Sequence, residues 1–208
     1  MREKLRELRY IPYLLSHPIN GFWELKREKR GSLFTAMVIL AVYILLTVLS
    51  QFMTAYIFNP QAVLEINVPL LILPVVGLYL LWCVSSWCLT SLFDGEGSFH
   101  DIFVTVGYAM LPLPLLLLPT TVMCNVLSAE EGMIVSLLTT VAYGWTIGLI
   151  FLGMTSIHHY GPGRNLAAML MSGLGMLVIT FLLLLFASLT QKLGMFIHNV
   201  IVELSYRL

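Results

Sequence analysis

The chain has 208 residues, of which 59% are hydrophobic and 11% are charged, and its mean hydropathy is +0.90. Soluble domains usually contain about 25% charged residues, so this composition excludes a protein whose only solvent is water. The eleven acidic and eleven basic residues cancel, but eight of the basic residues lie in the N-terminal segment 1–32. The neutral total therefore conceals a strongly basic end of the chain.

Segment 1–32 mixes apolar residues such as Leu5 and Leu8 with basic residues, and it presents Phe22 and Trp23 before a second basic cluster. This pattern predicts a cytoplasmic amphipathic helix that lies in the interface of an anionic leaflet. The alternative is that the bases serve only as a topology signal. The residues predicted to lie at the membrane interface are Arg6, Arg9, Phe22, Trp23, Lys26, Arg27, Lys29 and Arg30.

Five apolar runs follow this segment. A spanning helix needs about 20 mostly apolar residues, because the hydrocarbon core is about 30 Å thick and a helix rises about 1.5 Å per residue. The runs that meet this requirement, all without Asp, Glu, Lys or Arg, are Leu33–Phe58, Val68–Phe93, Ile102–Leu127, Met133–His158 and Leu166–Thr190. Short connectors favour antiparallel neighbours, so the sequence predicts an all-α polytopic bundle with five transmembrane helices over residues 33–190.

The distribution of basic residues predicts the orientation of the bundle. Basic residues near the spans resist translocation across the membrane. The N-terminal segment and the second and fourth connectors contain nine Lys and Arg residues, including Arg164, whereas the opposite side contains only Lys192 and Arg207. We therefore predict a cytoplasmic N-terminus and an extracytoplasmic C-terminus.

The third run contains Pro112, Pro114 and Pro119. Each proline lacks a backbone N–H and breaks a helical hydrogen bond, so these residues predict a kinked or interrupted helix. Broken helices can line the substrate site of a transporter, but that role usually comes with an intramembrane charge, which is missing here. A structural kink is the preferred interpretation.

Small residues in the fourth and fifth runs are candidates for close helix packing, because they let helix backbones approach each other. Contacts inside the bundle are preferred over contacts between chains. The predicted helix-packing residues are Gly144, Gly148, Gly153 and Gly173.

Segment 191–208 repeats apolar residues at helical spacing and is too polar to span, so it is predicted to be a short amphipathic C-terminal helix. It could lie on the outer leaflet or dock against a partner helix. The candidate docking residues are Phe196, Ile197, Val200, Ile201 and Leu204.

No chemical motif points to catalysis. The sequence has no zinc-protease, P-loop or dinucleotide-binding motif, and its predicted spans carry none of the acidic or basic side chains that proton relays and ion coupling require. His158 and His159 are adjacent and point about 100° apart on a helix, so they cannot ligate one metal ion together. Cys83, Cys88 and Cys124 lie in apolar runs and are expected to be reduced. We therefore expect no enzymatic activity, metal, cofactor or nucleic-acid partner.

Several short motifs carry a family resemblance. They are His17-Pro18, Gly21-Phe22-Trp23-Glu24-Leu25, Gly95-Glu96-Gly97-Ser98-Phe99 and Gly107-Tyr108-Ala109-Met110-Leu111-Pro112, with weaker support from Trp145, Gly153 and His158. In their order and five-span layout the chain resembles the Yip domain family, the Rab-interacting membrane proteins of eukaryotes and their bacterial relatives. It lacks the long acidic N-terminal region and the Asp-Leu-Tyr-Gly-Pro motif of the eukaryotic members. The resemblance therefore implies a bacterial member in the cytoplasmic membrane.

Some bacterial relatives are associated with ABC transporters. The resemblance thus implies a non-enzymatic accessory or scaffold protein that contacts the lipid bilayer and other integral membrane proteins, with ABC transporter permease subunits as the first candidates. Its candidate surfaces are the basic segment, the Gly95–Phe99 turn and the C-terminal helix. One alternative is a small-solute transporter in which Thr120, Thr121 and Asn125 line a pathway. Another is a membrane-shaping or lipid-binding protein.

Overall fold

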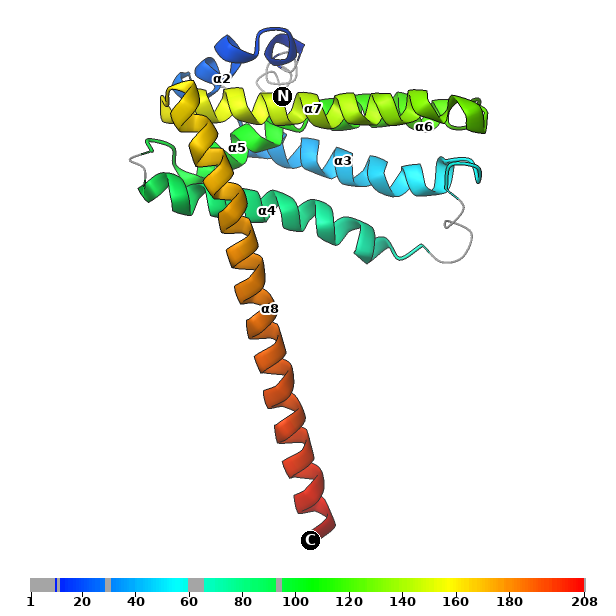
Figure 1. The fold of residues 1–208 in the computed structure, drawn as a ribbon, viewed down its shortest axis with the longest axis vertical. Helices are drawn as coiled ribbons and strands as arrows, with labels where there is room; N and C mark the ends of the chain where they lie inside the picture. Colours follow the sequence, from blue (N-terminus) through cyan, green and yellow to red (C-terminus); the bar gives the residue numbers. More distant parts are fainter. Residues whose placement is uncertain (1–9, 11, 29–30, 60–65, 93–94, 208) are drawn as a thin grey trace.

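A computed structural model describes residues 10, 12–28, 31–59, 66–92 and 95–207 of the chain. Within these ranges the chain is helical and has no strand, which confirms the predicted all-α class. Five helical segments are long and apolar enough to cross a membrane, as predicted. The elements in Figure 1 are α2 (Pro18–Arg27), α3 (Leu33–Met53), α4 (Val68–Leu92), α5 (Phe99–Ala109), α6 (Pro112–Met123), the 3₁₀ turn η2 (Ala129–Glu131), α7 (Gly132–His158) and α8 (Pro162–Arg207).

Serine caps begin three of the helical segments. The Ser32 hydroxyl accepts a backbone N–H in the first turn of α3. Ser98 and Asp101 form a reciprocal capping box at the start of α5, and Ser128 and Glu131 form another before α7. Each box satisfies backbone donors that the first helical turn leaves unpaired. These local bonds allow short connectors to reverse the chain between antiparallel helices.

The third apolar run is divided into two helices. Helix α5 ends just before Met110 and Leu111, and Pro112 begins α6. Pro112 cannot donate a hydrogen bond to the carbonyl four residues earlier, so the α5 ladder stops there. Pro114 lies in the first turn of α6, where a missing N–H is tolerated, and Pro119 lies inside α6 without ending it. The interruption therefore lies at the N-terminal side of the first proline.

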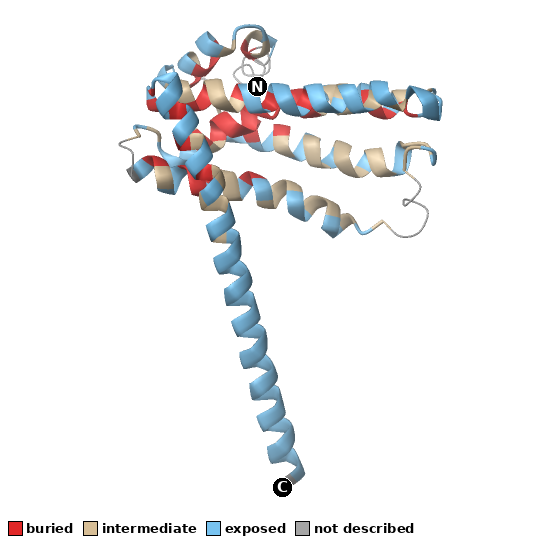
Figure 2. Cartoon of the chain, viewed as in Figure 1, coloured by how far each residue is buried: buried red, intermediate tan, exposed pale blue. Residues whose placement is uncertain are grey.

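Helix α5 lies at the centre of the fold and contacts α3, α4 and α7. Figure 2 shows that the buried residues gather around α5 and the adjoining part of α7. Ile102 and Tyr108 of α5 are fully buried. The Tyr79 hydroxyl of α4 donates to the Phe103 carbonyl at 2.6 Å, and the two rings pack edge to face. The core thus occupies the half of the bundle that contains α5.

The first turns of α8 are fixed to the bundle by polar contacts. The Asn165 amide donates to the Phe151 carbonyl at 2.9 Å and to the Thr155 hydroxyl at 2.7 Å, both on α7. The Ser85 hydroxyl of α4 donates to the Ser172 carbonyl at 2.6 Å. Hydrogen bonds between helices away from water hold α8 at a defined position against α4 and α7.

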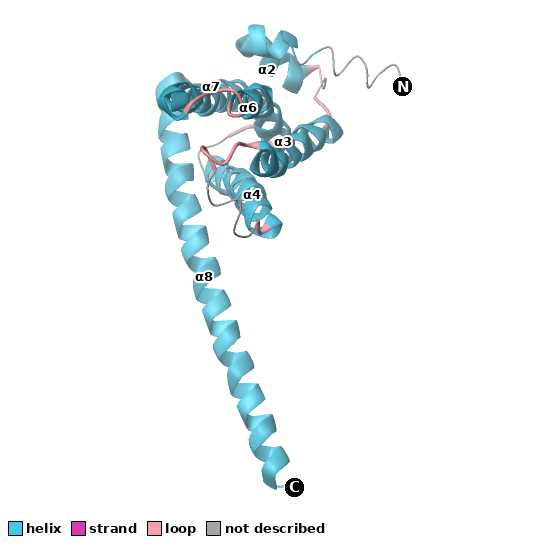
Figure 3. Ribbon diagram, turned by 90° about the vertical axis from the view of Figure 1, so that its right-hand side faces the viewer, coloured by secondary structure: helices cyan, strands magenta, loops and turns pink. Residues whose placement is uncertain are grey.

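Beyond these contacts, α8 leaves the bundle. Figures 1 and 3 show it crossing the other long helices steeply and extending away from them. Every side chain described from Phe181 to Tyr206 is exposed. With 46 residues, α8 is about 69 Å long, well over the thickness of a hydrocarbon core. It therefore departs from the side-by-side arrangement that the short connectors predicted.

The predicted boundary between the fifth span and a separate C-terminal helix does not appear as a break in α8. The helix runs without interruption through Thr190 and Gln191, because no proline stands near that point to stop it. The five candidate docking residues of segment 191–208 all lie exposed on the protruding part of α8. They are Phe196, Ile197, Val200, Ile201 and Leu204.

Candidate functional site

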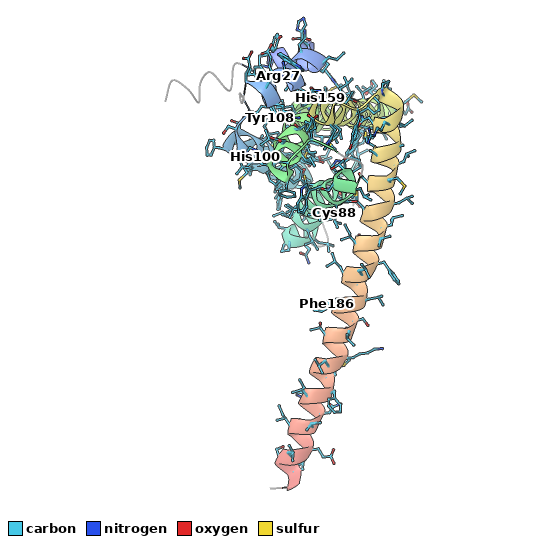
Figure 4. The ribbon with its side chains drawn as sticks, turned by 90° about the vertical axis from the view of Figure 1, so that its left-hand side faces the viewer. Arg27, Cys88, His100, Tyr108, His159 and Phe186 are labelled. Carbon is cyan, nitrogen blue, oxygen red and sulfur yellow. The ribbon has the colours of Figure 1, made fainter. Side chains whose placement is uncertain are left out.

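Several motifs that are distant in the sequence meet at one end of the bundle, where α2 packs against α5, α7 and the turn before α5. Figure 4, which looks at this end, shows Arg27 and His159 near each other and far from Phe186 on α8. We call this region the α2 junction. Its members are Phe22, Lys26, Glu96, Gly97, Thr105, Gly153, Ile157 and His158.

The apolar part of the junction depends on Gly153. The Phe22 side chain is fully buried, and two of its ring carbons lie 3.3 Å from where a Cβ at Gly153 would stand. The same Cβ would clash with the Cγ2 atom of Thr105 on α5. A glycine is required at this position because α2, α5 and α7 approach one another too closely for a side chain.

Lys26 provides the polar attachment of α2. Its Nζ donates to the Ile157 carbonyl at 2.6 Å and lies 3.7 Å from a carboxylate oxygen of Glu96. The carbonyls in the last turn of a helix are unpaired and carry partial negative charge, so a lysine there is favourable. His159 also approaches Glu96, at 3.8 Å. Lys26 therefore joins three segments that are distant in sequence.

His158 packs against the glycine-containing turn before α5. The Gly97 N–H donates to His158 Nδ1 at 3.3 Å, and the His158 ring stacks on Tyr160 with centroids 5.2 Å apart. A Cβ at Gly95 or Gly97 would lie 2.6 Å from the imidazole ring. Because Nδ1 accepts, Nε2 carries the proton, and among the described residues it has no hydrogen-bond partner. The buried histidine thus shapes the turn that carries Glu96.

His159 ends α7 in a left-handed conformation, with φ at 52°. This geometry turns its ring towards Glu96, whereas His158 faces the turn at Gly97. The two histidines therefore contact different partners. Among the described residues, no group of three or more His, Cys, Asp or Glu is placed to hold a metal ion. What this end of the bundle offers is a rigid attachment of α2 and an exposed surface.

The predicted membrane-interface residues divide between the interior and the surface. The Phe22 ring, which the sequence predicts at the membrane interface, is buried in the core, because Gly153 permits the close approach of α2 and α7. Trp23 and Arg27 are exposed, and the Arg27 guanidinium lies 5.0 Å from the centre of the Trp23 ring. Lys26 belongs to the α2 junction. The remaining four, Arg6, Arg9, Lys29 and Arg30, lie outside the described residues.

The four predicted helix-packing glycines differ in how closely other helices approach them. A Cβ at Gly144, Gly148 or Gly173 would meet nothing within 4 Å among the described residues, so these three glycines make no close contact there inside the bundle. They face away from the bundle, and only Gly153 is in a tight internal contact. The prediction also missed close approaches at Gly107 and Gly175, which face Ala36 and Ser85. Apolar composition alone does not reveal which side of a helix meets another helix.

A small cavity lies between α3, α6 and α7, beside the proline-rich run. Its volume is about 40 Å³, which is room for a very few water molecules. Thr120 lines it, but its hydroxyl donates to the Leu116 carbonyl of its own helix. Thr121 and Asn125 likewise donate to carbonyls one turn earlier in the chain. The polar residues considered for a solute pathway are therefore bonded to their own backbone.

Comparison with known proteins identifies the family of the chain. The model of the Yip1 domain matches residues 13–192, which include α2, every long helix before α8 and the bundle-attached part of α8. No curated protein and no solved structure matches the chain. The motifs quoted for the resemblance lie inside the matched region, and five of the eight residues of the α2 junction belong to them. The chain belongs to the Yip1 domain family.

Proposed function

We propose that this multi-span membrane protein is a non-enzymatic accessory or scaffold subunit that binds other integral membrane proteins. The first candidate partner is the permease part of an ABC transporter. The protein would reside in the bacterial cytoplasmic membrane with its N-terminus in the cytoplasm and its C-terminus outside, as the distribution of Lys and Arg favours.

The observation that carries this proposal is the exposed length of α8. Large apolar side chains such as Phe181, Phe186 and Phe196 are at least 60% exposed. A helix fixed at one end by Asn165 and Ser85 and free along the rest can reach a neighbouring protein while it remains anchored. Large contiguous apolar surfaces of this kind mark sites of protein or membrane interaction.

Site-specific photo-crosslinking tests this proposal in cells. A photoreactive phenylalanine analogue at Phe186 or Phe196, which are 69% and 65% exposed, should form adducts with a transporter permease subunit. The matched control is the same analogue at Phe52 of α3, which is 62% exposed but lies away from α8. Adducts with lipid alone at all three positions would contradict a partner-binding role for α8.

A small-solute transporter is the second candidate, because the interrupted third span borders the cavity between α3, α6 and α7. The cavity is small and its hydroxyls are bonded to their own helix, so this support is weaker. A membrane-shaping or lipid-binding role is the third candidate, and it is favoured only by the exposed face of α2.

A further inference from the structure

Helix α2 has two distinct faces. Gly21, Phe22 and Leu25 are buried against the bundle. Ile19 is 67% exposed and Trp23 is 43% exposed, and Arg27 continues the same spacing at the surface. Because residues four apart lie on one side of a helix, these last three form a single stripe, which we call the outer strip.

The α2 junction fixes the level of the outer strip along α7. Phe22 packs on Gly153, which precedes the end of α7 by five residues, or about 7.5 Å of helix. Interfacial helices bury their apolar face about 5–10 Å into the boundary between headgroups and acyl chains. Figures 1 and 3 show α2 outside α7, on the lateral side of the bundle. The outer strip therefore lies on the outside of the bundle, level with the last turns of α7.

The chemistry of the strip fits an anionic lipid. Tryptophan is favoured at the level of the headgroups. The Arg27 guanidinium covers the Trp23 ring at 5.0 Å, which leaves its planar N–H edge available for the bidentate hydrogen bonds that arginine makes to phosphate. The surrounding run 26–30 has four basic residues and one acidic residue. We propose that the outer strip of Ile19, Trp23 and Arg27 binds the headgroups of anionic phospholipids, with α2 held as a fixed part of the bundle.

Fluorescence quenching by brominated lipids tests where the strip lies. The purified full-length chain is placed in nanodiscs whose lipids carry bromine either near the headgroup end or near the middle of the acyl chain. Trp23→Phe should remove a component that the shallow bromines quench most. Trp145→Phe is the matched control, because Trp145 is exposed and lies about 20 Å from the end of α7, so the component it removes should be quenched most by the deep bromines. A Trp23 component quenched by aqueous iodide and by neither lipid would overturn the proposal.

Lipid retention tests the role of Arg27. Native mass spectrometry of the chain from nanodiscs with phosphatidylcholine and phosphatidylglycerol should show about fivefold less bound phosphatidylglycerol for Arg27→Gln, the change expected for one basic residue at an anionic surface. Lys192→Gln removes one exposed charge from α8 and should leave retention unchanged. Equal losses of bound phosphatidylglycerol in the two variants would show that the outer strip does not bind anionic headgroups selectively and would overturn the proposal. Both tests use the chain alone, so they do not depend on a transporter partner.

Discussion

Gly153→Val should destabilise the folded bundle by about 3 kcal/mol relative to Gly148→Val, a cost in the upper range for inserting a side chain into a packed core. A Cβ at Gly153 would clash with Thr105 and press on the Phe22 ring, whereas a Cβ at Gly148 would meet nothing within 4 Å. Both positions lie inside α7, so the loss of glycine and the gain of a β-branched residue cancel in the comparison. The difference isolates the close approach of α2, α5 and α7.

Thermal unfolding of the two variants in one mild detergent measures this difference. We expect Gly153→Val to melt well below the wild type and Gly148→Val to melt close to it. Gly153→Ala should fall between them, because it introduces a smaller group at the same point. Equal melting temperatures for the two valine variants would show that Phe22 and Thr105 can move aside freely and that the junction is not tightly packed.

Lys26→Met should release α2 from the bundle while the spanning helices remain folded. The variant removes the bond from Lys26 Nζ to the Ile157 carbonyl and the ion pair with Glu96, while retaining most of the aliphatic side chain. A hydrogen bond from a charged donor contributes about 2 kcal/mol, which corresponds to about a thirtyfold increase in the open population of α2. Amide hydrogen exchange over residues 18–27 should rise by that factor.

Arg27→Met is the control, with all proteins in a mild detergent that offers no anionic headgroup, because Arg27 is exposed and makes no bond to α7 in the described structure. Its α2 amides should exchange at nearly the wild-type rate. If the two variants exchange alike, the attachment of α2 depends on Phe22 and Leu25 alone. Exchange in α6 and in the N-terminal half of α7 should stay unchanged in both variants, since the bonds of Lys26 lie at the last turn of α7 and at Glu96.

Much of the fold follows from the sequence for a simple physical reason. Backbone N–H and C=O groups in hydrocarbon must form hydrogen bonds within the chain. A long uncharged run that crosses the membrane therefore folds as a helix. The interruption of the third span just before Pro112 follows from the missing N–H of proline. The direction of α8 could not be predicted, because an apolar helix surface has the same composition whether it meets lipid or protein. That direction depends on long-range contacts such as those of Ser85 and Asn165, which fix where the helix crosses the bundle.

The junction was visible in the sequence only in part. Helical spacing places Phe22 and Leu25 on one face of α2 and Trp23 on another, so the buried face could have been found from periodicity alone. The bond between Lys26 and Ile157 could not, because it joins residues 131 positions apart. Nor does the sequence distinguish Gly153, which lies in a close helix contact, from Gly148, which does not. Residue type is the same at Gly153 and Gly148, and only long-range packing makes the first of them part of the junction.

A structure of the full-length protein extracted with its native lipids tests the central claim, that the protein acts through contact surfaces. We expect another integral membrane protein to lie along the part of α8 beyond Phe181, with α2 still seated on Gly153. An isolated chain with α8 folded against its own bundle and a hydrated, ligand-filled cavity between α3, α6 and α7 would contradict the claim and establish a transporter instead.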